Sequence, residues 1–441
     1  MGPSTPLERQ ESVTPVNHQA PASPWERQVS ASSLDYRSQA PDRRHDLDWL
    51  RVIAILLLVY FHTGMIFAAE WDWHIKNPET SRLVLEVNYF MSRWRMPLLF
   101  MISGIGTSFA LRRRTAGEYL RERAGRLLVP VVFGALVIVP PQIYLERIAG
   151  GAAYTSFLDF YPEVFTTGPY PQGNLSYHHL WFVFYLFLYS ATALPFFLYL
   201  RGSAGARIAG AVERLARGPG LYALALPLGA VLAALVVRFP GPQDVVHDVA
   251  HLLYYFNFFV YGYLLSVAGK VWDEIEARRR ASLTLAFLSI VAIDAIRWNG
   301  ATPDFEYSLA NTLYYLLQGF NAWCWVLAFL GYGKRYLNRP SRVLARLNEG
   351  IYPFYILHQT VIVVVGFYVV RVEESILAKY LFVSTVSILV SWAIYDLLVR
   401  PVPVMRFLFG MKPLPGAPDR ASFGEYSRSS SNLAPGTEIH G

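Results

Sequence analysis

An arginine and a histidine stand eleven residues apart in the apolar stretch 46–73, DLDWLRVIAILLLVYFHTGMIFAAEWDW. In a helix, eleven residues make three turns plus about 20° and rise about 16 Å, so Arg51 and His62 share one stripe. Ionisable groups inside a membrane are costly and usually functional. His62 is therefore a candidate general base or acyl-accepting nucleophile, because imidazole titrates near neutral pH. The alternative is a structural histidine that bonds a neighbouring helix.

The arginine at the start of this stretch has two interpretations. An arginine at the cytoplasmic end of a span often sets the topology or extends its side chain to the lipid headgroups. Asp48 lies three residues earlier on the same helix face and can pair with Arg51. Such a pair either orients the guanidinium group for binding or simply neutralises it.

Two more arginines stand three residues apart in RERAGRLLVPVVFG, so Arg123 and Arg126 are expected on one helix face at the inner membrane surface. Two guanidinium groups suit phosphate recognition, which predicts a clamp for an anionic donor such as acyl-CoA or a sugar nucleotide. A plain cluster of positive charge at the membrane surface is the alternative.

Further polar residues lie in or beside other apolar segments. His358 stands in YPFYILHQT, and His179 and Trp181 stand in HHLWF, where histidine and aromatic residues are also ordinary structural or interfacial groups. Tryptophans and a histidine in the loop WDWH could stack against a sugar or line the interface; they are Trp71, Trp73 and His74. Arg93 and Arg95 are expected to reach lipid headgroups, with Arg95 facing an acceptor as the alternative.

The elements that must position these residues are ten apolar segments, each close to the roughly 20 residues that cross a bilayer as a helix. They are 47–69, 92–111, 126–146, 178–200, 220–238, 250–269, 281–298, 309–332, 350–370 and 378–400. Lys and Arg gather in the connections after the second, fourth, sixth and eighth segments, while Asp and Glu predominate in the others. By the positive-inside rule, this alternation predicts an all-α, ten-helix membrane protein with both termini in the cytoplasm.

The composition excludes several other classes of protein. Of the 441 residues, 54% are hydrophobic and 16% charged, whereas soluble proteins carry about 25% charged residues. The net charge of +7 is spread over short connections, so no nucleic-acid partner is expected. Polar tails at 1–46 and 401–441 are predicted to be mostly disordered around one membrane domain at 47–400. A lone cysteine, Cys324, and the absence of zinc-type spacing predict no metal site and no bound cofactor.

Taken together, these motifs resemble the membrane-bound acyltransferase-3 family. The resemblance covers the first four segments and the ninth, whereas segments five to eight and ten match only in length and hydropathy. The matching positions are Arg51 and His62 in the first segment, Pro97, Ser103 and Gly104 in MPLLFMISG, Arg123, Arg126 and Pro130 in the third, His179 and Trp181 in the fourth, and His358 in the ninth. WDWHIKN, SRWRMPLLFMISG and VPVVFGALVIVPPQ look closest to the branch that contains the succinyl-transferase of osmoregulated periplasmic glucans.

This resemblance implies an O-acyltransferase in the bacterial cytoplasmic membrane that moves acetyl or succinyl from cytoplasmic acyl-CoA to a carbohydrate or glycan hydroxyl. His62 would be catalytic, and Arg51, Arg123 and Arg126 would bind the donor. Supporting roles fall to Asp48, Ser103, His179, Trp181 and His358. The competing interpretation is a transporter or flippase that uses His62 and His358 as relay groups, although neither an inverted repeat nor paired broken helices show in the sequence. A third interpretation, a membrane scaffold or sensor, does not explain why Arg51 and His62 lie on one stripe of the first span.

Overall fold

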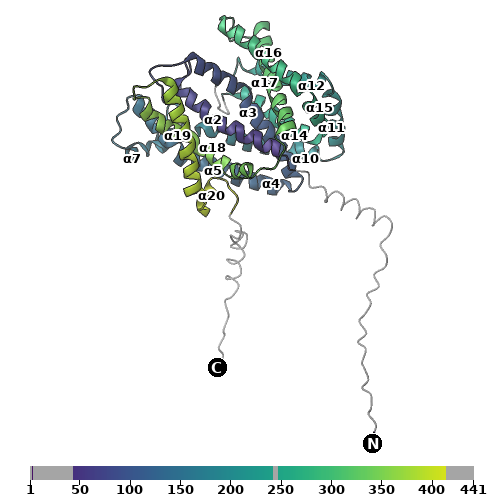
Figure 1. Ribbon diagram of the computed structural model, residues 1–441, viewed down its shortest axis with the longest axis horizontal. Helices are drawn as coiled ribbons and strands as arrows, with labels where there is room; N and C mark the ends of the chain where they lie inside the picture. The colour runs from purple at the N-terminus through teal and green to yellow at the C-terminus, as the bar shows by residue number, and fades with distance from the viewer. Residues whose placement is uncertain (1, 3–42, 242–246, 414–441) are drawn as a thin grey trace, which may run out of the picture. The chain divides into compact units, whose positions relative to one another are not determined.

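The structure is a computed structural model that describes residue 2 and residues 43–241 and 247–413. The chain consists of two units, Met1–Arg44 and His45–Gly441, and the helices described below belong to the second (Figure 1). Most of the predicted tail 1–46 and the part of the predicted tail after residue 413 lie outside the described residues. The first described helix begins at His45, and a short helix follows the membrane domain at Pro403–Leu408.

Within the described ranges the chain forms helices and only isolated β-bridges, which confirms the all-α prediction. The helices in the first half are α2 (His45–Phe67), α3 (Arg82–Leu111), α4 (Ala116–Arg123), η1 (Ala124–Leu128), α5 (Val129–Phe133), η2 (Gly134–Ile138), α6 (Pro140–Ala149), α7 (Phe157–Phe160), α8 (Glu163–Thr166), η3 (His178–Leu180), α9 (Trp181–Thr192), α10 (Leu194–Tyr199) and α11 (Ser203–Leu215). The remaining helices are α12 (Gly220–Ala223), α13 (Ala225–Leu235), α14 (Val249–Val267), α15 (Val271–Ala277), α16 (Arg279–Trp298), α17 (Leu309–Tyr336), α18 (Arg342–Val369), α19 (Ile376–Ile394), η4 (Tyr395–Val399) and α20 (Pro403–Leu408).

The count of ten spans is not confirmed. Among the described residues, six helices are long and apolar enough to cross a membrane, or eight when each of two sharply bent helix pairs is taken as one span. The predicted spans 92–111 and 178–200 account for the difference. The first lies in α3, which carries Arg93 and Arg95 within its length, and the second breaks between α9 and α10 at a proline. The predicted orientation of the termini stays a prediction.

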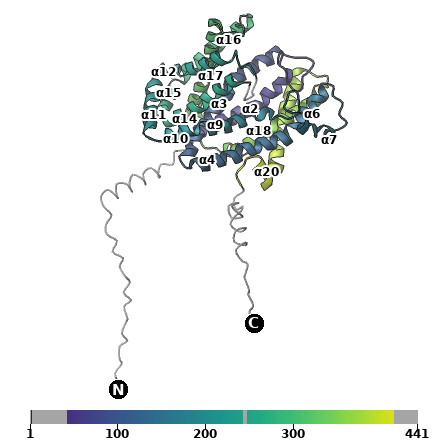
Figure 2. The ribbon, with the colours of Figure 1, turned by 180° about the vertical axis from the view of Figure 1, so that it is seen from behind.

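Helix α2 lies at the centre of the helices that carry the candidate residues, between α3, α17, α18 and α19 (Figures 1 and 2). Its contacts with α18 follow one direction along both helices. Arg51 bonds Asn348, His62 lies against His358, and Ile66 lies against Gly366. The two helices therefore run parallel, as the predicted first and ninth spans should, and residues far apart in the sequence pair along their whole length.

Two glycines allow α3 and α14 to approach each other closely. A Cβ on Gly104 would lie 1.9 Å from the carbonyl oxygen of Phe259, and one on Gly262 would lie 2.1 Å from that of Met101. Both distances are far inside van der Waals contact, so backbone packs directly on backbone here. The glycine of the predicted MPLLFMISG motif thus serves helix packing.

The segment that carries the paired arginines is not a regular α-helix. Between Ala116 and Ala149 two π-helical turns, η1 and η2, interrupt the α-helical hydrogen bonding. Such turns often mark functional sites, because they shift the face on which the following side chains lie. Arg123 ends α4 and Arg126 lies inside η1, so the two side chains are not related by ideal α-helical spacing.

Candidate functional site

His62 and His358 face each other across the contact between α2 and α18, with ring centroids 5.2 Å apart. The Nδ1 atom of His62 is buried and has no hydrogen-bond partner among the described residues. A structural histidine would be expected to use its ring nitrogens in hydrogen bonds to neighbouring helices. The open Nδ1 therefore favours a reactive role for His62 over a structural one.

Backbone carbonyls orient the two imidazoles that accompany His62. His358 Nδ1 lies 2.5 Å from the carbonyl oxygen of Tyr355, and His179 Nε2 lies 2.9 Å from that of Ile356. Each of these nitrogens must carry the proton, because a carbonyl can only accept. The other nitrogens, His358 Nε2 and His179 Nδ1, are buried without a partner in the described structure. With centroids 5.4 Å apart, the two rings extend the group that begins at His62.

Arg95 is the nearest positive charge, and sequence reasoning gave it a minor place. Its side chain is buried rather than directed to lipid headgroups, with 3% of the residue exposed. The guanidinium lies 4.0 Å from the ring centre of Phe61 and interacts electrostatically with His62. Within the described residues, its Nε and Nη1 atoms have no hydrogen-bond partner. A buried cation without an anionic partner is costly, so this position suits a substrate group that carries or develops negative charge.

The connection after α2 folds back over the histidines because Lys76 holds it in place. Its ammonium donates to the carbonyl oxygens of Met65, Ala68 and Trp71 at 2.9, 2.6 and 2.8 Å. Burial lowers the pKa of Lys76, and the nearby charge of Asp72 opposes that effect. These bonds join the C-terminal end of α2, where a cation is favoured by the helix dipole, to the loop that follows it.

The same loop places an aromatic ring against the candidate base. The ring of Trp73 stacks on that of His62 with centroids 6.1 Å apart and planes 21° apart. Trp71 instead contacts Phe61 and Tyr89. Of the two tryptophans named from the sequence, only Trp73 therefore contacts the ring of His62, in a position where a sugar could stack.

At the other end of α2, Arg51 connects two helices. Its Nη2 donates to Asp48 at 2.8 Å, as the spacing predicts, and to the side-chain oxygen of Asn348 in α18 at 2.6 Å. The guanidinium is partly exposed, so it can still contact a bound ligand. Asp48 acts as an orienting partner in this arrangement.

Each arginine of the predicted clamp has its own partners in the protein, so the clamp stays a prediction. Arg123 donates to the Thr107 hydroxyl at 3.1 Å, and that hydroxyl donates in turn to the carbonyl of Ser103. Arg126 bonds the carbonyl of Gly410 at 3.3 Å and pairs with Glu122 at 3.3 Å. Ser103 thus supports Arg123 through its backbone, while its own hydroxyl bonds the preceding turn of α3.

One face of α18 joins the arginines to the histidines, and sequence reasoning missed most of it. The Tyr352 hydroxyl donates to the carbonyl of Arg126 at 3.0 Å, and Tyr352 interacts electrostatically with both clamp arginines. The Tyr355 hydroxyl donates to the carbonyl of His179. The residues on this face are Asn348, Tyr352, Tyr355 and Gln359, with His358 beside them. Their spacing of three to four residues was the available signal, because it repeats once per helical turn.

Trp181 supports the site from a distance. Its ring contacts those of Phe100, Tyr185 and Tyr255, at centroid distances of 5.2 to 6.2 Å. Tyr255 in turn lies close enough to Arg95 to interact with it electrostatically. Trp181 therefore belongs to an aromatic wall behind Arg95, and its predicted supporting role is a matter of packing.

Comparison with known proteins shows which family the chain is similar to. The family model described as "Acyltransferase domain" of the acyltransferase-3 family matches residues 44–396. Among curated proteins, glucans biosynthesis protein C from Escherichia coli O81 (strain ED1a) and from Escherichia coli (strain K12) are similar, each 24% identical over 388 residues, covering 84% of this chain and 95% of theirs. No solved structure matches the chain. The family match covers most of the chain, and the chain therefore belongs to the acyltransferase-3 family.

Proposed function

We propose that this membrane acyltransferase transfers an acetyl or succinyl group from cytoplasmic acyl-CoA to a hydroxyl of a carbohydrate or glycan at the outer face of the membrane. The observation that carries the proposal is the arrangement on α2 and α18. Both helices have a basic or polar end, at Arg51 and Asn348, and a histidine about 15 Å further along, at His62 and His358. A long donor with a charged head and a reactive end fits this layout.

The donor side lies where Arg51, Arg123 and Arg126 meet the start of α18. The guanidinium group of Arg51 bonds Asn348, while the Tyr352 hydroxyl bonds the backbone carbonyl of Arg126 and interacts electrostatically with Arg123 and Arg126. Phosphates of the CoA nucleotide would replace part of the present protein contacts of these arginines, because guanidinium–phosphate bonds are charge-assisted. The pantetheine arm would then follow the Tyr352 and Tyr355 face of α18 and bring the thioester to the histidines.

At the histidines, His62 would take the proton from the acceptor hydroxyl while its oxygen attacks the thioester carbonyl. The new C–O bond forms a tetrahedral oxyanion, which the unpaired N–H groups of Arg95 stabilise. Collapse of this intermediate breaks the C–S bond, and the CoA thiolate leaves and takes the proton from the His62 imidazolium. Transient acylation of His62, with later transfer to the acceptor, is the nucleophilic variant of the same reaction.

The acceptor would approach from the side covered by the loop after α2. Trp73 already stacks on His62, and an aromatic face of this kind suits a sugar ring. The names of the similar proteins, glucans biosynthesis protein C, point to glucans as the first acceptors to test.

A transporter with His62 and His358 as relay groups is the competing function, and the 5.2 Å between their rings makes proton passage geometrically feasible. Purified protein in lipid vesicles, given labelled acyl-CoA and a glucan, separates the two. The enzyme releases one free CoA for each acyl group that appears on the glucan. Glucan movement across the vesicle membrane without release of CoA would contradict the proposal.

A further inference from the structure

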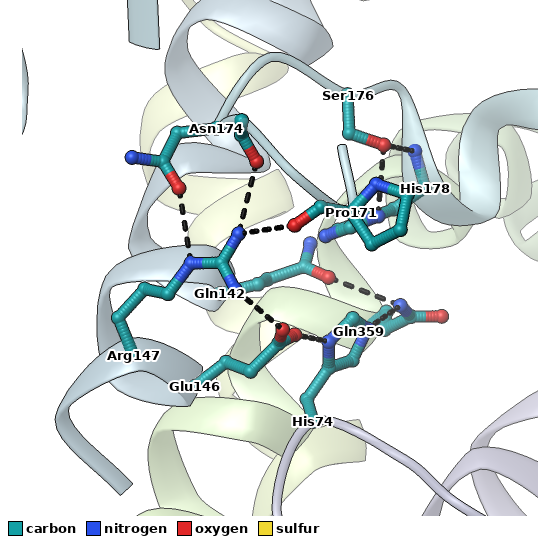
Figure 3. Close-up of polar contacts among 10 residues, drawn as sticks. His74, Gln142, Glu146, Arg147, Pro171, Asn174, Ser176, His178 and Gln359 are labelled. Atoms are coloured by element: carbon teal, nitrogen blue, oxygen red, sulfur yellow. Dashed lines mark hydrogen bonds and ion pairs between the residues drawn. The ribbon is translucent and has the colours of Figure 1, made fainter. Parts of the chain in front are cut away.

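Outside the His62 site, three segments bring together two histidines and a glutamate (Figure 3). His74 lies in the loop after α2, Glu146 in α6, and His178 at the start of η3. One potential ligand atom from each residue lies within 4.8 Å of the other two. The rings of His74 and His178 have centroids 4.6 Å apart, and His74 Nδ1 contacts the Glu146 carboxylate.

The cluster contains a buried donor atom without a partner. His178 Nε2 is buried and forms no hydrogen bond with any described residue. Its other nitrogen, Nδ1, bonds the Ser176 hydroxyl at 2.9 Å, and that oxygen also accepts the backbone N–H of His178 at 3.0 Å. When Nδ1 donates its proton to Ser176, the lone pair of Nε2 is available to a metal ion.

Neighbouring residues hold the three side chains in the manner of supports around a metal site. The Gln359 amide lies 3.3 Å from His74 Nε2 and bonds Gln142 at 3.0 Å (Figure 3). The Tyr170 hydroxyl hydrogen-bonds the Glu146 carboxylate, and the Tyr170 ring lies edge-on to that of His178 with centroids 4.8 Å apart. Arg147 donates to the loop at Pro171, Gly173 and Asn174, and its Nη1 atom also lies 3.9 Å from a carboxylate oxygen of Glu146.

We propose that His74, Glu146 and His178 bind a divalent transition-metal ion, with zinc as the best fit. Two imidazoles and a carboxylate are a three-residue zinc set that leaves a fourth position open for water or a ligand. Zinc bonds of about 2.0–2.2 Å place ligand atoms roughly 3.3 Å apart. The present separations of up to 4.8 Å would close by side-chain rotation, and the hydrogen-bonded His74 and Glu146 would move slightly apart.

The ion would hold in place the loop after α2, which covers the side from which the acceptor is proposed to approach. His74 directly follows Trp73, whose ring stacks on His62, so a metal that ties His74 to α6 and η3 also holds Trp73 in place. The ion's role is positioning, and the site stands whether or not the acyl donor and acceptor proposed above are correct.

Full-length protein carrying a histidine-free affinity tag, purified in detergent and treated with a chelator, tests this site. Dialysis against micromolar zinc followed by elemental analysis should give about one zinc per chain. Cobalt should give the visible absorption of a four-coordinate ion. His178→Gln and Glu146→Gln should each lower bound zinc at least tenfold, while His251→Gln, which alters a histidine paired with Asp248 in α14, should retain it.

Ser176→Ala provides a milder variant if the ligand substitutions prevent folding. It keeps all three ligands, removes the hydroxyl that bonds both His178 Nδ1 and the His178 backbone N–H, and should weaken zinc affinity about tenfold, as loss of a support to a metal ligand commonly does. Wild-type protein that binds no more zinc than His178→Gln, or binding that Ser176→Ala leaves unchanged, would overturn the proposal. The cluster would then be a hydrogen-bonded group that joins the three segments.

Discussion

His62 and His358 belong to parallel helices and lie with ring centroids 5.2 Å apart, although 296 residues separate them in the sequence. The proton of His358 Nδ1 is directed to the carbonyl of Tyr355, and the lone pair of its Nε2 has no partner among the described residues. One imidazole is thus oriented by the backbone beside a second whose Nδ1 is open. This pair is the centre of the candidate site.

Replacement of His62 by glutamine should lower kcat for acyl transfer by about 10²–10⁴-fold, because general-base catalysis contributes on that scale. The KM for acyl-CoA should change little, since the proposed donor contacts lie at the other end of α2. Initial rates of CoA release with purified protein measure both constants. His251→Gln is the matched control, because this partly exposed histidine in α14 pairs with Asp248 and its ring contacts Tyr254 and Tyr255. Full activity of His62→Gln would remove the catalytic role.

Arg95→Met should lower kcat by about 10²–10³-fold, the usual effect of losing an oxyanion donor. Arg95→Lys should recover part of the rate, because it restores the charge but not the shape of the guanidinium. The same rate measurements serve, with thermal melting in detergent to show that both variants fold. A higher donor KM with normal kcat would show that Arg95 binds the donor and leaves the transition state unaffected.

The paired substitution Arg123→Gln and Arg126→Gln should raise the KM for acyl-CoA by at least tenfold, because phosphate contacts are lost. The same variant should lose little further affinity when the donor lacks its 3′-phosphate, whereas the wild type should lose more. Arg121→Gln is the control, since this exposed arginine lies in the last turn of the same short helix. Equal donor saturation in the paired variant and the control would contradict the clamp.

Gly104→Ala should lower the free energy of unfolding by about 1–3 kcal/mol or more. The added methyl group would overlap the carbonyl oxygen of Phe259 and push α3 away from α14. Gly106→Ala is the matched control two residues along the same helix, where a Cβ meets no atom within 4 Å. That control should melt at the wild-type temperature or above it, since alanine favours helix. Thermal melting of the wild type and both variants in detergent, followed by intrinsic tryptophan fluorescence, measures the effect. Equal melting temperatures for all three proteins would show that α3 and α14 can move apart without loss of stability.

The sequence alone determined the features that depend on local order. Hydropathy and charge identified an all-α membrane protein, and helical periodicity placed Arg51 and His62 on one stripe. Both follow from residues within a few turns of each other. Local order also has limits, because hydropathy predicted ten spans. Two of the predicted segments are not helices long and apolar enough to cross a membrane: the segment in α3 contains Arg93 and Arg95, and the other is broken before Pro195.

Only the tertiary structure decided which residues meet. The pairing of α2 with α18 depends on packing between helices at opposite ends of the chain, and nothing near His62 in the sequence specifies it. Arg95 was expected to contact lipid headgroups because it directly precedes the apolar run MPLLFMISG, but packing against Phe61 buries it beside His62. His74, Glu146 and His178 show the same limit. Their long separations in sequence resemble no metal motif, and only the fold brings their ligand atoms within reach of one ion.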